Sequence, residues 1–181
     1  EMEDIKKRAD DALAEIEMLK KELAKSKSDA DQLRLTKAYY KETDALSAID
    51  WFNKGYNAAE NKEYDKAISY YLRAIELGPD YADAYTNLGA SYYDQGNYTK
   101  AIESYKKTIE LKPDYALAYN NLGIAYNNQG NYTKAIESYK KAIELDPDYA
   151  DAYTNLGVGV AYYDQGNYTK AIESYKKAIE L

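Results

Sequence analysis

The chain has 181 residues, with 24 basic against 31 acidic side chains, 23 tyrosines, no cysteine and no histidine. Without thiols or imidazoles it has no disulfide, no thiol nucleophile and neither of the usual ligands of structural zinc, and we expect no cofactor. The net charge of −7 repels phosphate backbones, and the first residues contain no continuous apolar stretch, so we expect a cytoplasmic protein that neither binds nucleic acid nor inserts into a membrane.

Residues 1–47 are predicted to form an N-terminal helical segment, because their apolar positions follow alternating steps of three and four. Such a seam is typical of a coiled coil, but it is short, so a helix docked on the rest of the chain is an equal alternative. Ser26-Lys27-Ser28 interrupts it, and Ser28 can cap a second helix that runs to about Glu42. The seam consists of Met2, Ile5, Ala9, Ala12, Ile16, Leu19 and Leu23.

The rest of the chain repeats one unit every 34 residues. A period of this length marks helix-turn-helix repeats. The repeated units are 48–81, 82–115, 116–149 and 150–181.

Each unit has the pattern of a helical hairpin. In the second unit, Gly96-Asn97 breaks the helix, and Pro113-Asp114 separates this unit from the next, with Asp114 as the N-cap of the following helix. Apolar residues recur at helical spacing on both sides of the break. The stripe of the first helix is Tyr85, Leu88, Gly89 and Tyr92, and that of the second is Ala101, Ile102, Tyr105, Thr108 and Ile109.

These motifs resemble the signature of the tetratricopeptide repeat (TPR) family, with aromatic substitutions. The resemblance implies an all-α fold, a right-handed superhelical array of helix-turn-helix hairpins preceded by the N-terminal helical segment. It also implies a non-catalytic protein-binding scaffold, whose first helices line the concave face and carry the ligand contacts. The second unit reads Tyr85-x2-Leu88-Gly89-x2-Tyr92, Ala101-x3-Tyr105 and Pro113, and the third repeats it at Tyr119, Leu122, Gly123, Tyr126, Ala135, Tyr139 and Pro147.

The first and last units depart from the pattern. The first has Lys54 in place of Leu88 and Lys62 in place of Gly96, which suits a terminal repeat that faces solvent or a different neighbour. The last has two extra residues in Leu156-Gly157-Val158-Gly159-Val160-Ala161, which rotate one half of its first helix by roughly 200°. We therefore expect that helix to bulge, break or slide. Because the chain stops at Leu181 without an added polar helix, we expect its last apolar stripe to pair with another molecule or with the N-terminal helix.

The second and third units differ at eight of 34 positions, and six of these lie on the first helix. Five of the six share one helix face, opposite the packing stripe, which we interpret as the binding face; free drift of solvated positions is the alternative. Exposed Tyr93 and Ile124 favour binding, because solvent alone does not favour such side chains. The other three differences are Ser91/Ala125, Thr108/Ala142 and Lys112/Asp146. The candidate partner-binding residues are Asp83, Thr86, Ala90, Tyr93 and Asp94; Leu117, Asn120, Ile124, Asn127 and Asn128; and Asp151, Thr154, Tyr163 and Asp164.

The chemistry of this face limits the partner. Some members of the TPR family clamp a C-terminal carboxylate with lysine or arginine and an asparagine; the resemblance matches that asparagine to Asn87, Asn121 and Asn155, but the basic half is missing. The aspartates of the face instead predict a basic or hydroxyl-rich protein or peptide ligand. The alternative function is a structural protein that forms homo-oligomers through its N-terminal helix and open repeat end. We expect no enzyme, because near-copies of one unit give no unique polar cluster.

Overall fold

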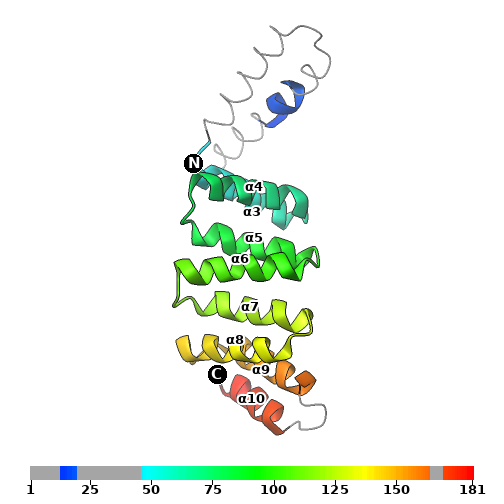
Figure 1. The fold of residues 1–181 in the computed structure, drawn as a ribbon, viewed down its shortest axis with the longest axis vertical. Coiled ribbons are helices and arrows are strands. Elements are labelled where there is room, and N and C mark those ends of the chain that lie inside the picture. The colour runs from blue at the N-terminus through cyan, green and yellow to red at the C-terminus, as the bar shows by residue number, and fades with distance from the viewer. Residues whose placement is uncertain (1–12, 20–45, 164–168) are drawn as a thin grey trace. The chain divides into compact units, whose positions relative to one another are not determined.

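The computed structural model describes residues 13–19, 46–163 and 169–181, apart from the side chains of residues 162, 163 and 169, and all regular secondary structure in these ranges is helical (Figure 1). This confirms the predicted all-α fold. No helix in these ranges is both long and apolar enough to cross a membrane. Besides the helical residues 13–19, the helices are α3 (Ala48–Glu60), α4 (Tyr64–Leu77), α5 (Ala82–Asp94), α6 (Tyr98–Leu111), α7 (Ala116–Asn128), α8 (Tyr132–Leu145), α9 (Ala150–Tyr163) and α10 (Thr169–Glu180).

The chain forms two compact units, residues 1–79 and residues 80–181. The N-terminal unit contains the hairpin α3–α4. The C-terminal unit contains the hairpins α5–α6, α7–α8 and α9–α10, and consecutive hairpins pack through α6 on α7 and α8 on α9. This is the stacked-hairpin arrangement that the repeat predicts.

The turn inside each hairpin is set by a glycine followed by an asparagine. Gly96 and Gly130 have φ angles of 76° and 82°, a left-handed conformation that glycine adopts without steric cost. The side chain of Asn97 then caps α6 by accepting a hydrogen bond from the backbone N–H of Lys100 at 3.2 Å, and Asn131 caps α8 in the same way.

Between hairpins, the predicted cap is wrong. The N-cap of α7 is Tyr115, one residue after Asp114, and no side chain caps this helix. The helix instead begins with backbone hydrogen bonds from Ala118 and Tyr119 to the carbonyl of Tyr115.

Within each hairpin, a glycine of the first helix lies against a tyrosine of the second. A Cβ atom placed at Gly123 would lie 2.5 Å from Cε1 of Tyr139, and one placed at Gly89 would lie 2.6 Å from Cε1 of Tyr105. Both rings are buried. Tyrosine therefore fills the space that the missing glycine side chain leaves, and this close packing brings the two helices of a hairpin together.

The core of the C-terminal unit runs without interruption from one hairpin into the next. Leu122, Ala125 and Tyr126 of α7 lie in one cluster with residues of α6 and of α8. The first helix of each hairpin is thus shared between its own second helix and the second helix of the hairpin before it. The other members of the cluster are Ala101, Ile102, Tyr105, Ala135 and Tyr139.

The two extra residues of the last hairpin do not interrupt its first helix. α9 is continuous α-helix from Ala150 to Tyr163, so the predicted bulge or break is wrong. Gly157 keeps the position opposite a tyrosine, with 3.0 Å between an added Cβ and Cε1 of Tyr175. Helical continuation then gives Gly159 and Val160 the buried places that Ala125 and Tyr126 hold in α7.

The N-terminal unit keeps the hairpin with different side chains. Ser47 and Asp50 form a capping box at the start of α3. Lys62 has a φ of 59°, so the turn keeps the left-handed conformation without glycine. Lys54 is buried rather than facing solvent, with its Nζ 5.7 Å from the ring centre of Trp51 and 5.5 Å from that of Tyr70.

Of the predicted N-terminal seam, only Ile16 and Leu19 lie among the described residues. Ile16 is 4% exposed, so its side chain is packed within the N-terminal unit. The other seam positions, and the second helix predicted to start at Ser28, lie outside the described residues, so the coiled coil and the docked helix both stay predictions.

Candidate functional site

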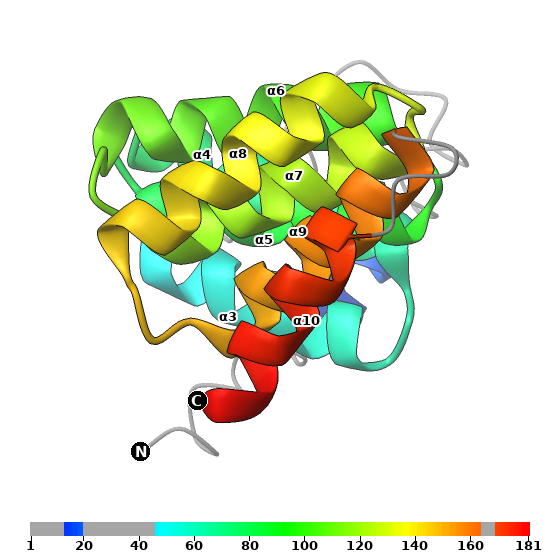
Figure 2. The ribbon, with the colours of Figure 1, turned by 90° about the horizontal axis from the view of Figure 1, so that it is seen from below.

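The first helices of the C-terminal unit form a continuous layer. α7 contacts both α5 and α9, whereas among the described residues the second helices α6 and α8 do not contact each other. Figure 2 shows α6 and α8 on one side of this unit and α5 and α7 on the other. The first helices are therefore packed more closely than the second ones, and the surface of their layer is the candidate site.

The structure divides the predicted site residues into four groups by exposure. Five side chains are exposed and five are half-buried, and these ten remain candidates for ligand contact. Two more are buried, and two lie outside the described residues. The exposed ones are Asp94, Leu117, Asn128, Asp151 and Thr154; the half-buried ones are Asp83, Ala90, Tyr93, Ile124 and Asn127; Thr86 and Asn120 are buried; the side chain of Tyr163 and all of Asp164 are not described.

The predicted placement of Thr86 and Asn120 on a free face is wrong. Thr86 is 8% exposed, and its Oγ1 lies 3.2 Å from Oγ1 of Thr108 on α6. Asn120 is 4% exposed, and its Oδ1 accepts a hydrogen bond from Nδ2 of Asn155 on α9 at 3.0 Å. Both side chains lie at the edge of the face, where a neighbouring helix covers them, so they stabilise the fold and do not offer a ligand contact.

Tyr93 and Ile124 are also not free, which corrects the expectation that both are exposed. The Tyr93 hydroxyl accepts a hydrogen bond from Nδ2 of Asn128 at 3.0 Å, and its ring centre lies 5.5 Å from that of Tyr98. Burial, together with the charges of Tyr98 and Asp94, raises the pKa of the Tyr93 hydroxyl, and the hydrogen bond from Asn128 opposes this. Ile124 packs against the core cluster. Their apolar surface is already used within the chain.

Contacts inside the chain account for much of the variation between the second and third repeats. Asp83 accepts an ion-paired hydrogen bond from Lys112 at 2.8 Å, and the third repeat replaces both partners, by Leu117 and Asp146. The Thr86–Thr108 pair is likewise replaced at both positions. Variation that changes two touching side chains together reflects packing, so variability alone does not identify ligand contacts.

The replacement of Thr86 and Thr108 as a pair can be tested by a double-mutant cycle. Thr86→Asn alone is expected to destabilise the protein by roughly 1–3 kcal/mol, because the larger amide meets Thr108 in a buried space. Adding Thr108→Ala, the combination of the third repeat, is expected to recover at least about 1 kcal/mol of that loss. Urea unfolding of wild type, both single variants and the double variant measures the coupling; additive effects would contradict the pairing.

The first helices of the C-terminal unit carry acidic and amide side chains and no basic ones. α5, α7 and α9 contain aspartate and asparagine but neither lysine nor arginine. Asp94 and Asp151 are exposed. Near α9, burial and the charges of Asp151, Tyr115 and Asp146 raise the pKa of the Tyr149 hydroxyl, and a hydrogen bond with Asn120 opposes this. The layer therefore presents a negative potential to solvent.

Two exposed apolar residues of the N-terminal unit occupy the same repeat positions and were missed by the sequence comparison. Ile49 and Tyr56 on α3 correspond to Asp83 and Ala90 on α5, and they are 62% and 50% exposed. Extending the alignment of the repeats back by 34 residues would have found them. In this unit the equivalent face of the first helix is apolar rather than acidic.

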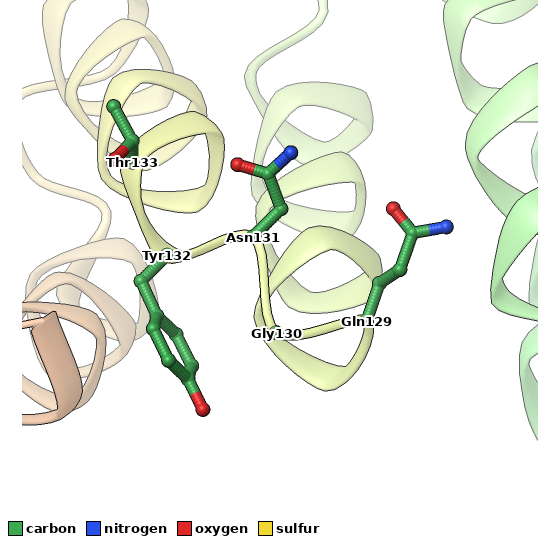
Figure 3. A pocket seen from close by; sticks show the side chains of 5 residues that line it. All are labelled: Gln129, Gly130, Asn131, Tyr132 and Thr133. Carbon is green, nitrogen blue, oxygen red and sulfur yellow. The ribbon is translucent and has the colours of Figure 1, made fainter.

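A shallow pocket of about 380 Å³ lies at the turn between α7 and α8, away from the predicted residues. Figure 3 shows the amides of Gln129 and Asn131 on one side of the loop and the ring of Tyr132 on the other. Gln129 also donates a hydrogen bond to Oγ1 of Thr99 in the preceding hairpin at 3.3 Å, which joins neighbouring turns. In the described ranges no group of carboxylates gathers in a way that could hold a metal ion.

With this architecture, the comparison with known families identifies the repeat. A sequence model described as "TPR repeat" matches residues 55–96 and 89–130, and one described as "Tetratricopeptide repeat" matches residues 116–149 and 150–181. The chain belongs to the tetratricopeptide repeat family. Among curated proteins, no sequence matches this chain.

Solved structures of TPR proteins have the same arrangement of hairpins. The crystal structure of MamA is 27% identical, with a TM-score of 0.71, and the match covers 86% of this chain and 95% of MamA. The TPR domain of Sgt2 from Aspergillus fumigatus is 27% identical, with a TM-score of 0.63 over 66% of this chain and 81% of that domain. The second TPR domain of Spaghetti (RPAP3), bound to the HSP90 peptide SRMEEVD, is 25% identical, with a TM-score of 0.53 over 55% of this chain and 91% of that domain.

Proposed function

We propose that this TPR chain is a non-catalytic scaffold that binds a protein or peptide segment on the layer of its first helices. Membership of the TPR family and the similarity to a TPR domain bound to a peptide support this function. The observation that carries the finer proposal is the charge of the layer. Exposed Asp94 and Asp151 lie on helices that contain no basic residue.

This charge favours a basic or hydroxyl-rich ligand. The peptide in the RPAP3 complex, SRMEEVD, ends in acidic residues, and acidic side chains of a ligand would meet like charges on α5 and α9 here. Arginine or lysine would find exposed carboxylates, and serine or threonine hydroxyls could donate to them or to the amide of Asn128. Because the carboxylates are exposed, their contribution is sensitive to salt and acts mainly through specificity.

The half-buried side chains limit how the ligand can lie. Tyr93 and Asn128 are joined by a hydrogen bond between neighbouring first helices, and Ile124 fills the space beside them. A ligand therefore meets a preformed surface between α5 and α7 rather than a row of independent side chains. Preorganisation of this kind reduces the entropy lost on binding.

Fluorescence anisotropy with two labelled peptides tests the proposal. One probe alternates serine and arginine, and the other is the acidic peptide SRMEEVD. The double variant Asp94→Asn/Asp151→Asn is expected to bind the basic probe roughly tenfold more weakly, a loss of about 1.4 kcal/mol. The matched control is Asp114→Asn/Asp148→Asn, which removes the same charge from exposed turns between hairpins, and we expect it to stay close to wild type.

Two results would overturn the proposed ligand chemistry. The first is binding of SRMEEVD as tight as that of the basic probe. The second is an equal loss of affinity in both double variants, because that would show attraction by net charge alone.

A further inference from the structure

The last helix of the C-terminal unit carries an exposed apolar stripe. Ile172 and Ile179 lie seven residues apart, two turns along the same face of α10, and they are 51% and 84% exposed. Lys176 lies between them on this face, and it is exposed.

In the preceding hairpins the same positions are covered. Ile102 on α6 is 6% exposed and lies in the core cluster with residues of α7. Ile136 on α8 lies against α9, with 3.4 Å between its Cγ1 and a Cβ placed at Gly159. Lys106, the equivalent of Lys176, lies over the ring of Tyr126 on the next hairpin, with 5.9 Å from Nζ to the ring centre. The stripe on α10 is thus a packing surface that elsewhere in this chain meets another helix.

We propose that this stripe is an interface between two copies of the chain, formed by α10 of one copy on α10 of the other. The surface continues the series of interfaces that α6 makes with α7 and α8 makes with α9. It lies on a different helix from the proposed ligand-binding layer, so the two proposals stand or fall separately.

The burial of the first helices decides why the second copy uses its own α10. Inside the chain, the stripe on a second helix is covered by a first helix such as α7. In the N-terminal unit the equivalent side chains of α3, Trp51, Lys54 and Ala58, are 6%, 7% and 4% exposed. Since these are already covered, a head-to-tail contact has no free surface to use. A symmetric contact, in which each copy contributes the same face, is the remaining arrangement of two copies.

The size of the stripe predicts a weak dimer. Two isoleucines per copy are a small apolar surface compared with the total of about 1,200–2,000 Å² that stable protein interfaces bury. Two copies of Lys176 would lie close to the two-fold axis, and Glu173 and Glu180 on the same side of the helix can offset their repulsion. We therefore expect a dimer that forms at high protein concentration and dissociates on dilution.

Analytical ultracentrifugation of the full chain over a range of concentrations tests the dimer. The wild-type sedimentation coefficient is expected to rise with concentration, and Ile172→Glu/Ile179→Glu is expected to remove the rise without loss of helical content. Ile49→Glu is the matched control, since Ile49 is also exposed but lies on α3. A wild-type chain that stays monomeric at every concentration, or a rise that Ile49→Glu removes and the double variant keeps, overturns the proposal.

Disulfide trapping tests the symmetry of the contact, because the chain has no cysteine of its own. In Lys176→Cys, each new thiol would meet its counterpart across the two-fold axis, so oxidation is expected to give a covalent dimer in high yield. Lys140→Cys, at the equivalent exposed position on α8, is expected to cross-link only slowly. Equal yields from the two variants, or more dimer from Lys140→Cys, would overturn the symmetric α10 contact.

Discussion

Replacing Tyr139 with alanine is expected to lower the free energy of unfolding of the C-terminal unit by about 3–5 kcal/mol. The ring is 2% exposed and fills the space beside Gly123, and it also lies against α9, with 3.4 Å between Cε2 and a Cβ placed at Gly159. Its loss would leave a cavity that contacts both hairpins. Urea unfolding followed by circular dichroism measures the change.

Tyr132→Ala is the matched control for this experiment. Tyr132 is half-buried at the start of α8, where it lines the turn pocket, and we expect its loss to cost roughly 1 kcal/mol or less. Equal destabilisation by the two substitutions would contradict the role assigned to the ring of Tyr139 between the hairpins.

Alkaline pH is expected to unfold the protein steeply. Burial is the main cause that raises the pKa of the hydroxyl of Tyr71, Tyr105 and Tyr139 well above its ordinary value. Above about pH 10 the unfolded chain loses these protons while the folded chain retains them, so stability is present below that pH and falls as pH rises. Each such tyrosine contributes a slope of about 1.4 kcal/mol per pH unit.

Urea unfolding at a series of pH values above about 10 measures this slope. Tyr105→Phe keeps the ring but has no proton to lose, so its slope is expected to be smaller by about 1.4 kcal/mol per pH unit. An unchanged slope in Tyr105→Phe would contradict the assignment. Tyrosinate absorbance recorded in the same samples shows whether ionisation accompanies unfolding.

The sequence by itself determined the hairpin and its repetition. The period of 34 residues placed the helices, and the glycine–asparagine pairs placed the turns at Gly96 and Gly130. Such signals are local or periodic, and they depend on backbone conformation and on which face of a helix is apolar. The same signals could not predict the continuous helix through Gly157 and Gly159, because packing outweighs the weak helix propensity of glycine.

The candidate site was predicted only in part. Helical periodicity correctly put Asp94, Asn128 and Asp151 on an exposed face. It could not show that Thr86 and Asn120, at the edge of that face, are covered by other helices. A helical wheel gives the direction of a side chain from its own axis, whereas burial depends on how near the next helix lies.

Only the tertiary structure decided which side chains meet. Lys112 reaches Asp83 over 29 residues, Asn128 reaches Tyr93 over 35, and Asn155 reaches Asn120 over 35. The stacking of hairpins sets these contacts, and the same stacking leaves Ile179 exposed while its equivalent Ile109 packs against the core cluster. A repeat can place identical residues in identical helices, but their surroundings differ with the neighbour that each helix has, because burial depends on contacts between hairpins.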